Sequence, residues 1–296
     1  MINLRGIKAR PRDIEVMLGH NPSLVEMHCS VKDYEWNPDS MSKNAQFMCI
    51  HDNIGLAVHL PEYDHWNLLD AATEDERLRK MAESVYVQGV GRATSWAPFF
   101  AGKTKVVFHP GGISLDVMSE AARRRSLTAL DRTIEAMLKA ADGKVDILVE
   151  NMPRHCWFFS GDWMANVALR AAETAEICKR HGIGATLDVC HLYLASQALG
   201  FDPVDEIGAV KPYVRHVHYS DARGDSGEGL QLGTGDLPIG KMLGELADLP
   251  VVAVPEIWFG HEKHGYAFRE AWDLAEIALA ASGKKVWQNA VCPGGH

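Results

Sequence analysis

The sequence lacks long hydrophobic runs, a cysteine pattern and an excess of positive charge, and each absence excludes a class of protein. No apolar run reaches the roughly 18 residues that a membrane span requires. The six cysteines form no CxxC pair and no tight framework, which excludes a disulfide scaffold and favours free thiols in a reducing cytoplasm. The net charge of −9 supplies no field that attracts a polyanion, and this disfavours a nucleic-acid partner.

The N-terminal segment MINLRGIKARPR is basic and lacks the apolar segment of a signal peptide. We therefore expect a cytoplasmic protein with no membrane partner. Of the 296 residues, 47% are hydrophobic, which is enough to bury a full core. Because no linker or low-complexity stretch divides the chain, we expect a single domain over residues 1–296, with a core at 2–281 and a C-terminal tail at 282–296.

Short apolar runs alternate with segments of helical spacing along the whole chain. The runs predict strands at residues 2–4, 23–28, 55–60, 105–109, 145–150, 184–189, 214–219 and 251–257. The helical spacing predicts helices at residues 73–84, 115–141, 162–181, 204–210, 238–246 and 267–281. This alternation is typical of βαβ units and a parallel sheet.

Residues that bind metals stand at the ends of most of these runs. They are His59, His109, Glu150, Asp188, His218 and Glu256. In a closed (β/α)8 TIM barrel, all strand ends of this kind meet at one face, whereas an open doubly wound sheet concentrates polar residues at one switch point. We therefore predict a TIM barrel, with the open sheet as the alternative.

Each strand-end residue taken alone is about as often a buried polar group or a helix cap as a metal ligand. Together, three carboxylates and an imidazole from different strands, Glu150, Asp188, Glu256 and His218, form a mixed oxygen and nitrogen set. Such a set suits a divalent ion such as Mn²⁺, Co²⁺, Mg²⁺ or Zn²⁺. His59 and His109 are candidates for a second ion that Glu150 bridges.

Three further residues lie near these strand ends. Glu26 and His28 end the second run and could reach the pocket, but a structural role, or one that supports the ligands from behind, is as common for such residues. His216 is two residues before His218, and we expect one of the two to face the barrel interior and the other the helices. The spacing to Asp221 favours His218 as the interior residue.

The segments VFHPGG, LVENMP, TLDVCH, HVHYSD, GTGDLP and VPEIW resemble the xylose-isomerase-like TIM-barrel superfamily. The resemblance spans roughly residues 55–258. That superfamily holds sugar isomerases and epimerases as well as apurinic endonucleases of the endonuclease IV type.

Similarity to the ketose 3-epimerases implies one Mn²⁺-type ion, bound by Glu150, Asp188, His218 and Glu256. It also implies that Glu150 and Glu256 act as catalytic base and acid, and that His191 and Arg223 bind substrate oxygens. A divalent ion that chelates neighbouring carbonyl and hydroxyl oxygens acidifies the C–H between them and stabilises an enediolate. Cys156 stands where those epimerases carry another Glu.

Similarity to endonuclease IV implies instead that His59 and His109 bind a zinc ion together with Glu150. Asp188, His218 and Glu256 would then join Glu150 around a second zinc, and His191 would be the one remaining ligand of a third site. Such a cluster would activate water for attack on a phosphodiester. The D-x-H pair expected after the seventh strand is missing, since residues 221–235 contain no His. No basic, aromatic-rich insertion that would grip a phosphate backbone is evident.

The sequence therefore predicts a metal-dependent isomerase, epimerase or dehydratase that acts on a small sugar or polyol through an enediolate. The first alternative is a two-metal hydrolase acting on a phosphodiester or abasic DNA. The second is a catalytically silent barrel that serves as a binding domain. A homodimer is a possible assembly.

Overall fold

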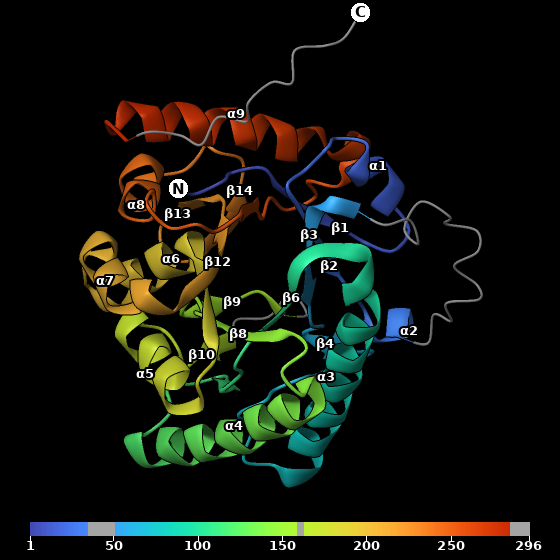
Figure 1. The fold of residues 1–296 in the computed structure, drawn as a ribbon. Helices are drawn as coiled ribbons and strands as arrows, with labels where there is room; N and C mark the ends of the chain where they lie inside the picture. Colours follow the sequence, from blue (N-terminus) through green and yellow to red (C-terminus); the bar gives the residue numbers. More distant parts are fainter. Residues whose placement is uncertain (35–50, 159–162, 285–296) are drawn as a thin grey trace, which may run out of the picture.

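The computed structural model describes residues 1–34, 51–158 and 163–284, and its centre is an eight-stranded parallel sheet (Figure 1). The strands follow one another around the sheet in chain order, each pairing in parallel with the next. They are β1 (Gly6–Ala9), β2 (Leu24–His28), β3 (His51–His59), β6 (Phe100–Phe108), β8 (Asp146–Glu150), β11 (Gly184–Asp188), β12 (Val214–Tyr219) and β15 (Ala253–Pro255).

The two ends of the sheet meet, so that the sheet forms a nearly closed barrel. Asn3 bridges Val252 in parallel, with its N–H 2.8 Å from the Val251 carbonyl and its C=O 2.7 Å from the Ala253 N–H. The prediction of a (β/α)8 TIM barrel is thereby confirmed. The predicted first strand at residues 2–4 is wrong, because the Asn3 side chain accepts the Arg5 N–H and separates this bridge from β1.

Helices surround the barrel and follow its strands along the chain (Figure 1). They are α1 (Ile14–Leu18), α2 (Val31–Tyr34), α3 (Glu76–Trp96), α4 (Glu120–Ala141), α5 (Ala171–His181), α6 (Val189–Leu199), α7 (Pro203–Val210), α8 (Ile239–Glu245) and α9 (Tyr266–Ala281). Among the described residues, none of the helices combines the length and apolar character needed to cross a bilayer.

Three helix predictions were wrong in their bounds. Helix α4 begins at Glu120 and not at residue 115, because the Ser119 side chain caps it by accepting the Ala122 N–H. Helix α3 continues to Trp96 because buried residues recur along one face well beyond residue 84. The helix predicted at 162–181 begins only at Ala171, since Trp163–Ala165 (β10) pairs with neighbouring loops. In the expected tail at 282–296, residues 285–296 lie outside the described part of the chain.

Short hairpins and a small sheet follow the carboxyl ends of the barrel strands and build up that face. One hairpin, β4 (Tyr63–Asp64) with β5 (Asn67–Leu68), follows β3. A three-stranded sheet joins β7 (Ile113–Ser114), β10 and β9 (His155–Cys156). A second hairpin, β13 (Asp221–Arg223) with β14 (Gly227–Leu230), follows β12. These loops enclose the space above the strand ends.

Candidate metal centre and cavity

The carboxyl ends of four strands bring together a set of donor atoms that we call the four-ligand group. Glu150, Asp188, His218 and Glu256 each offer one atom, and these atoms all lie within 4.8 Å of one another. His218 Nδ1 lies 3.2 Å from Glu150 Oε1 and 2.9 Å from Glu256 Oε2. It lies 4.0 Å from Asp188 Oδ2. The residues predicted from the sequence as ligands of one ion therefore surround a single point.

His59, His109 and Glu150 form a second set, the histidine group, whose donor atoms also lie within 4.8 Å of one another. Glu150 Oε2 lies 3.3 Å from His59 Nε2 and 3.5 Å from His109 Nε2. The other oxygen of Glu150 faces His218 in the four-ligand group. Glu150 is thus placed between both groups, as a carboxylate that bridges two ions would be.

Unsatisfied buried atoms test whether these residues fit a metal. His59 Nε2, Glu150 Oε2 and Glu256 Oε2 are buried without a hydrogen-bond partner. Leaving a buried polar atom unpaired costs about 1–3 kcal/mol, more for a charged group. All three atoms point into the two groups, so the donor set fits one or two divalent ions of the kind that carboxylates and imidazoles bind.

The backbone around Asp188 holds this carboxylate in place. Asp188 Oδ1 caps helix α6 by accepting the His191 N–H at 2.8 Å, which leaves Oδ2 to face His218. Asn151 clamps the ends of β8 and β11 together, since its side chain bonds the Asp188 N–H and C=O at 2.9 Å each. Burial raises the pKa of Asp188 to about 6, assisted by the Glu150 and Glu256 carboxylates and opposed by His191.

A tight turn after β6 positions His109. Gly111 and Gly112 have φ of 82° and 71°, which a residue with a side chain rarely adopts. Asp70 accepts the N–H groups of Gly112 and Ile113 at 2.8 and 2.9 Å. A Cβ on Gly111 would lie 2.0 Å from Asp70 Oδ1, so the turn needs glycine here.

Behind the four-ligand group, Glu26 holds two imidazoles. The Nε2 atoms of His216 and His218 both lie 2.7 Å from Glu26 Oε2. Both histidines therefore face the barrel interior, and the expectation that they face opposite sides is wrong, because residues two apart on a strand share a face. Glu26 does not line the cavity and contacts these imidazoles from behind, which is the supporting role weighed for it, whereas His28 lines the cavity. The contact with Glu26 fixes Nδ1 of His218 toward the carboxylates.

Lys8 on β1 adds a positive charge to the centre. Its Nζ forms an ion pair with Glu256 Oε1 and lies 3.4 Å from Glu26 Oε1. Burial lowers the pKa of Lys8, but the carboxylates of Glu256, Glu26 and Glu150 outweigh burial and raise it, so the ammonium stays charged. Sequence reasoning missed Lys8, because nothing in the segment RGIKAR marks it as different from a surface lysine.

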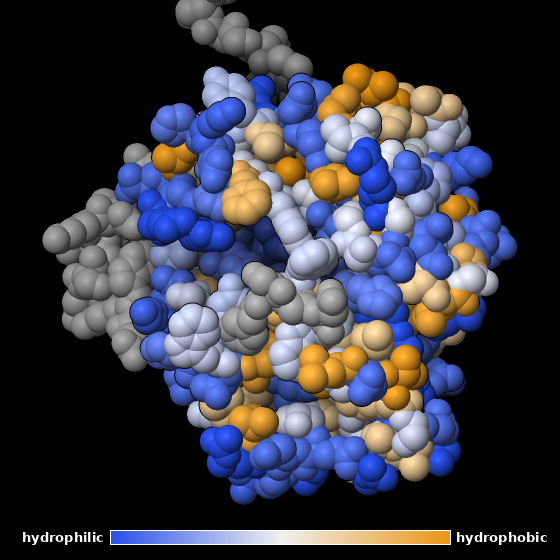
Figure 2. All heavy atoms as spheres, turned by 180° about the vertical axis from the view of Figure 1, so that it is seen from behind, coloured by the Kyte–Doolittle hydropathy of each residue, from blue (hydrophilic) through white to orange (hydrophobic). Residues whose placement is uncertain are grey.

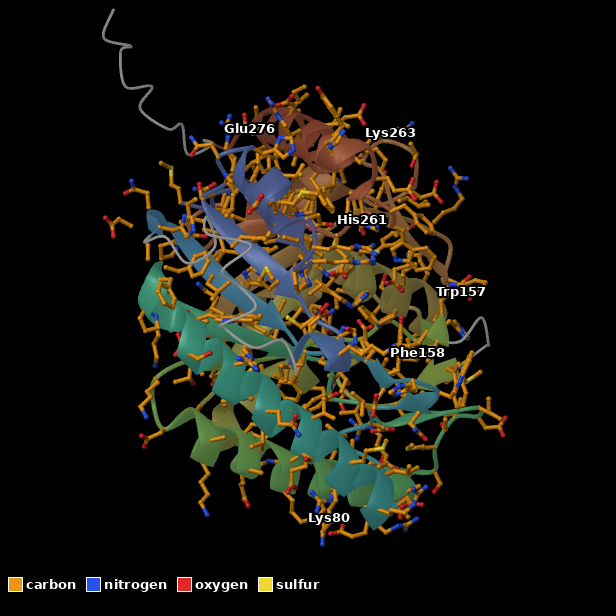
Figure 3. All side chains as sticks on the ribbon, turned by 90° about the vertical axis from the view of Figure 1, so that its right-hand side faces the viewer. Lys80, Trp157, Phe158, His261, Lys263 and Glu276 are labelled. Atoms are coloured by element: carbon orange, nitrogen blue, oxygen red, sulfur yellow. The ribbon has the colours of Figure 1, made fainter. Side chains whose placement is uncertain are left out.

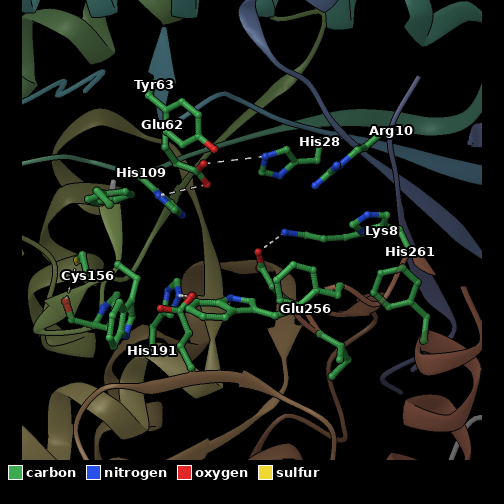
Figure 4. Close-up of a pocket in the computed structure, with 18 of the residues that line it drawn as sticks. Lys8, Arg10, His28, Glu62, Tyr63, His109, Cys156, His191, Glu256 and His261 are labelled. Carbon is green, nitrogen blue, oxygen red and sulfur yellow. Dashed lines mark hydrogen bonds and ion pairs between the residues drawn. The ribbon is translucent and has the colours of Figure 1, made fainter. Parts of the chain in front are cut away.

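Above the two groups lies a cavity of about 520 Å³ (Figure 4). The face shown in Figure 2 is hollowed near its centre, with hydrophilic atoms inside the hollow and hydrophobic residues on part of its rim. Polar residues that line the cavity include Lys8, Arg10, Glu62, His109, His191 and Glu256. Its apolar wall includes Met152, Trp157, Phe158, Trp258 and Phe259. Trp157, Phe158 and His261 lie on the same side of the molecule (Figure 3).

His191 and Arg223, the predicted substrate-binding residues, differ in position. His191 lines the cavity, with Nδ1 2.9 Å from the Asn151 carbonyl and Nε2 3.3 Å from Glu228 Oε1. Arg223 is exposed, does not line the cavity and donates to the Thr234 carbonyl. Cys156 lines the cavity, and burial raises the pKa of its thiol, so this residue cannot replace a carboxylate base.

The fold agrees with comparisons to known proteins. The chain belongs to the xylose isomerase-like TIM barrel family, whose model matches residues 23–275. The resemblance noted in the sequence is thereby confirmed.

A curated relative and two solved structures illustrate the range of this similarity. Probable endonuclease 4 of Mycobacterium bovis (strain BCG / Pasteur 1173P2) is 28% identical over 187 residues, which cover 61% of this chain and 66% of that protein. A D-tagatose 3-epimerase-like protein has a TM-score of 0.64 at 18% identity, over 94% of this chain and 98% of that chain. Endonuclease IV from Thermus thermophilus has a TM-score of 0.63 at 17% identity, over 94% and 99%. At these identities the two structures share the fold with this chain.

Proposed function

We propose that this protein is a divalent-metal-dependent isomerase or epimerase that acts on a small sugar or polyol through an enediolate. Dehydration of such a substrate starts with the same proton removal and belongs to the same proposal. The observation that carries it is the four-ligand group beneath a cavity of about 520 Å³. A cavity of this size suits a small molecule.

An ion held by Glu150, Asp188, His218 and Glu256, whether Mn²⁺, Co²⁺, Mg²⁺ or Zn²⁺, would polarise a substrate carbonyl and acidify the neighbouring C–H. Glu256 lines the cavity and is the group we assign to remove that proton. Epimerisation returns a proton to the opposite face of the same carbon, and isomerisation returns it to the adjacent carbon. His191 also lines the cavity, and its contact with Glu228 keeps a proton on Nε2 for this second transfer.

The sequence-based prediction paired Glu150 with Glu256 as base and acid. Glu150 is fully buried and does not line the cavity, and four imidazoles contact its two oxygens. We therefore assign Glu150 as a metal ligand and give the proton-transfer roles to Glu256 and His191. Arg223 is left out of the proposed site.

Hydrogen exchange tests this proposal before the natural substrate is known. The protein, loaded with Mn²⁺ in D₂O, is incubated with a panel of ketoses, and NMR follows deuterium entering the carbon next to the carbonyl. The Glu256→Gln variant is expected to slow exchange by about 10²–10⁴-fold, the usual contribution of a general base. Its circular dichroism should match the unaltered protein. Exchange at the unaltered rate in this variant would refute the role of Glu256.

A two-metal hydrolase acting on abasic DNA is the second candidate. The histidine group favours it, since His59 and His109 meet the oxygen of Glu150 that faces away from His218. The relative named probable endonuclease 4 points the same way. The experiment compares incision of an oligonucleotide containing one abasic site by the unaltered protein and by His109→Ala. Incision that His109→Ala abolishes would support the hydrolase, and ketose exchange that survives the same change would support the isomerase.

A further inference from the structure

Glu62, which follows β3 in the segment Leu60–Glu62, lies among three imidazoles at the edge of the histidine group. Glu62 Oε1 is 4.0 Å from His109 Nδ1, and Glu62 Oε2 is 4.0 Å from His28 Nε2 (Figure 4). His28, His59 and Glu62 offer donor atoms within 4.8 Å of one another. The rings of His28 and His59 stack at 5.1 Å. The pattern of metal-type residues in the sequence did not include Glu62.

The second nitrogen of each histidine near the ions gives the first reason to assign Glu62 a role. A histidine that binds a metal usually donates its other N–H to a carboxylate or a carbonyl. His59 does this through Nδ1 to the Leu60 carbonyl at 2.9 Å, and His218 through Nε2 to Glu26 at 2.7 Å. His109 Nδ1 is buried and has no hydrogen-bond partner, and the carboxylate that faces it is Glu62.

Charge gives the second reason. The four-ligand group contains three carboxylates, whereas the histidine group has two imidazoles and only a share of Glu150. A divalent ion at the histidine group would therefore have little negative charge around it. Glu62 faces both His109 and His28, so its carboxylate is placed to supply negative charge beside this group.

We propose that Glu62 is a positioning residue of the histidine group. With an ion at Nε2 of His109, the carboxylate would close the 4.0 Å gap to His109 Nδ1 and accept its N–H, while His28 Nε2, also 4.0 Å away, faces the other carboxylate oxygen. This inference rests on the proposed metal centre and holds for either reaction considered above. It distinguishes the histidine group, which depends on Glu62, from the four-ligand group, which does not.

Titration with Co²⁺ tests the inference without a substrate. Chelator-stripped protein is titrated by calorimetry, and the number of ions and both affinities are compared for the unaltered chain, Glu62→Gln and Glu62→Ala. We expect two ions in the unaltered chain. Glu62→Ala should weaken the second ion by about 10–100-fold, the usual cost of losing such a contact, and leave the first unchanged. Glu62→Gln keeps an acceptor oxygen but loses the charge. Its affinity for the second ion should therefore lie between those of the unaltered chain and Glu62→Ala.

Glu74→Gln serves as the matched control, because Glu74 is exposed and pairs with Arg125 away from the cavity. It should bind both ions as the unaltered chain does. A second ion bound by Glu62→Ala with unaltered affinity would overturn this inference alone. A single ion in the unaltered chain would overturn the histidine group itself, and with it both this inference and the two-metal hydrolase, while leaving the isomerase proposal in place.

Discussion

Lys8 is the residue whose removal should disturb the centre most directly. It is the cation against Glu26 and Glu256, and its side chain is 12% exposed. In the chelator-stripped protein, Lys8→Met leaves these carboxylates without their counter-charge and should lower the free energy of unfolding by about 3 kcal/mol. Added Mn²⁺ should restore part of this loss, because the ion supplies positive charge to the same carboxylates. Denaturant unfolding with and without Mn²⁺ measures both effects.

The matched control for Lys8 is Lys103→Met. Lys103 pairs with Asp146, and the two side chains are 48% and 39% exposed. Because exposed ion pairs contribute little, this change should stay within about 0.5 kcal/mol of the unaltered protein, with no response to Mn²⁺. Equal stability of Lys8→Met and Lys103→Met would show that Lys8 does not balance the buried carboxylates.

The pH dependence of metal binding follows from the protons that an ion must displace. Asp188 has a pKa of about 6, so below that pH a proton occupies one of the four ligands. Burial lowers the pKa of His218, but Glu26, Glu150 and Glu256 raise it well above its usual value, so His218 also carries a proton that binding must release. Affinity for Mn²⁺ should therefore rise with pH.

Calorimetric titration with Mn²⁺ from pH 5 to 8 measures this dependence. Where one proton is displaced, affinity should change about tenfold per pH unit, and the slope should steepen below pH 6, where Asp188 also holds a proton. Buffers of different ionisation enthalpy report the protons released directly. An affinity that is constant across this range would contradict ligation by Asp188 and His218.

The residues of the candidate metal centre differ in how well the local sequence predicts them. Glu150, Asp188 and Glu256 could be predicted because each directly ends or follows an apolar strand, and parallel strands end at one face. Lys8 and Glu62 could not, because their partners are set by the closed barrel rather than by neighbouring sequence. Lys8 meets Glu256 across 248 positions in the chain. The substrate-binding role predicted for Arg223 depended on the course of a loop, which turns that side chain to the Thr234 carbonyl.

At the scale of elements, the seam between β1 and β15 needs a residue without a side chain. A Cβ on Gly6 would lie 2.5 Å from Val254 Cγ2 and 2.7 Å from the Ala253 carbonyl. Gly6→Ala should therefore push the two strands apart and lower the free energy of unfolding by about 1–3 kcal/mol, the usual cost of overpacking. Thermal unfolding of the purified variant provides the measurement.

Gly91→Ala is the control for that change. Gly91 lies on an exposed position of α3, and a Cβ there meets nothing within 4 Å. Alanine should stabilise this helix by about 0.4–1 kcal/mol, because it restricts the unfolded chain and suits a helix. The two Gly-to-Ala changes should thus act in opposite directions, and a stabilising effect at Gly6 would contradict the close seam.

Strands and helices were predictable where the spacing of apolar residues fitted only one of the two. Seven of the eight strands were found near their observed positions, because their apolar runs are bounded by Gly, Pro or charged residues. The segment before α5 was mistaken for helix because its apolar residues, including Trp163 and Ala165, are buried by a small sheet rather than by a helical face. Local spacing could not reveal partners that come from other loops.

At the scale of the whole molecule, the alternation of strands and helices predicted a parallel sheet, and the metal-type residues at most strand ends favoured the barrel over an open sheet. Neither feature predicted the shape of the cavity, which depends on hairpins and aromatic side chains from loops far apart in the sequence. Trp157, for instance, donates to the Ser226 carbonyl at 2.8 Å and so joins the loop after β8 to the hairpin after β12. We expect the choice of substrate to depend on these loops.

The closure between the first and last strands also sets an order of events during synthesis of the chain. The strands β1 and β15 are the two ends of the sheet and meet when the barrel closes. Until β15 has left the ribosome, β1 therefore has only β2 as a neighbouring strand. At about 5–20 residues per second, the 248 positions between Lys8 and Glu256 correspond to roughly 12–50 s of synthesis. Glu256 is the last ligand to be made, so a nascent chain can gather the other ligands but cannot complete the four-ligand group. The four-ligand group is therefore expected to be complete only once the last strand has joined the barrel.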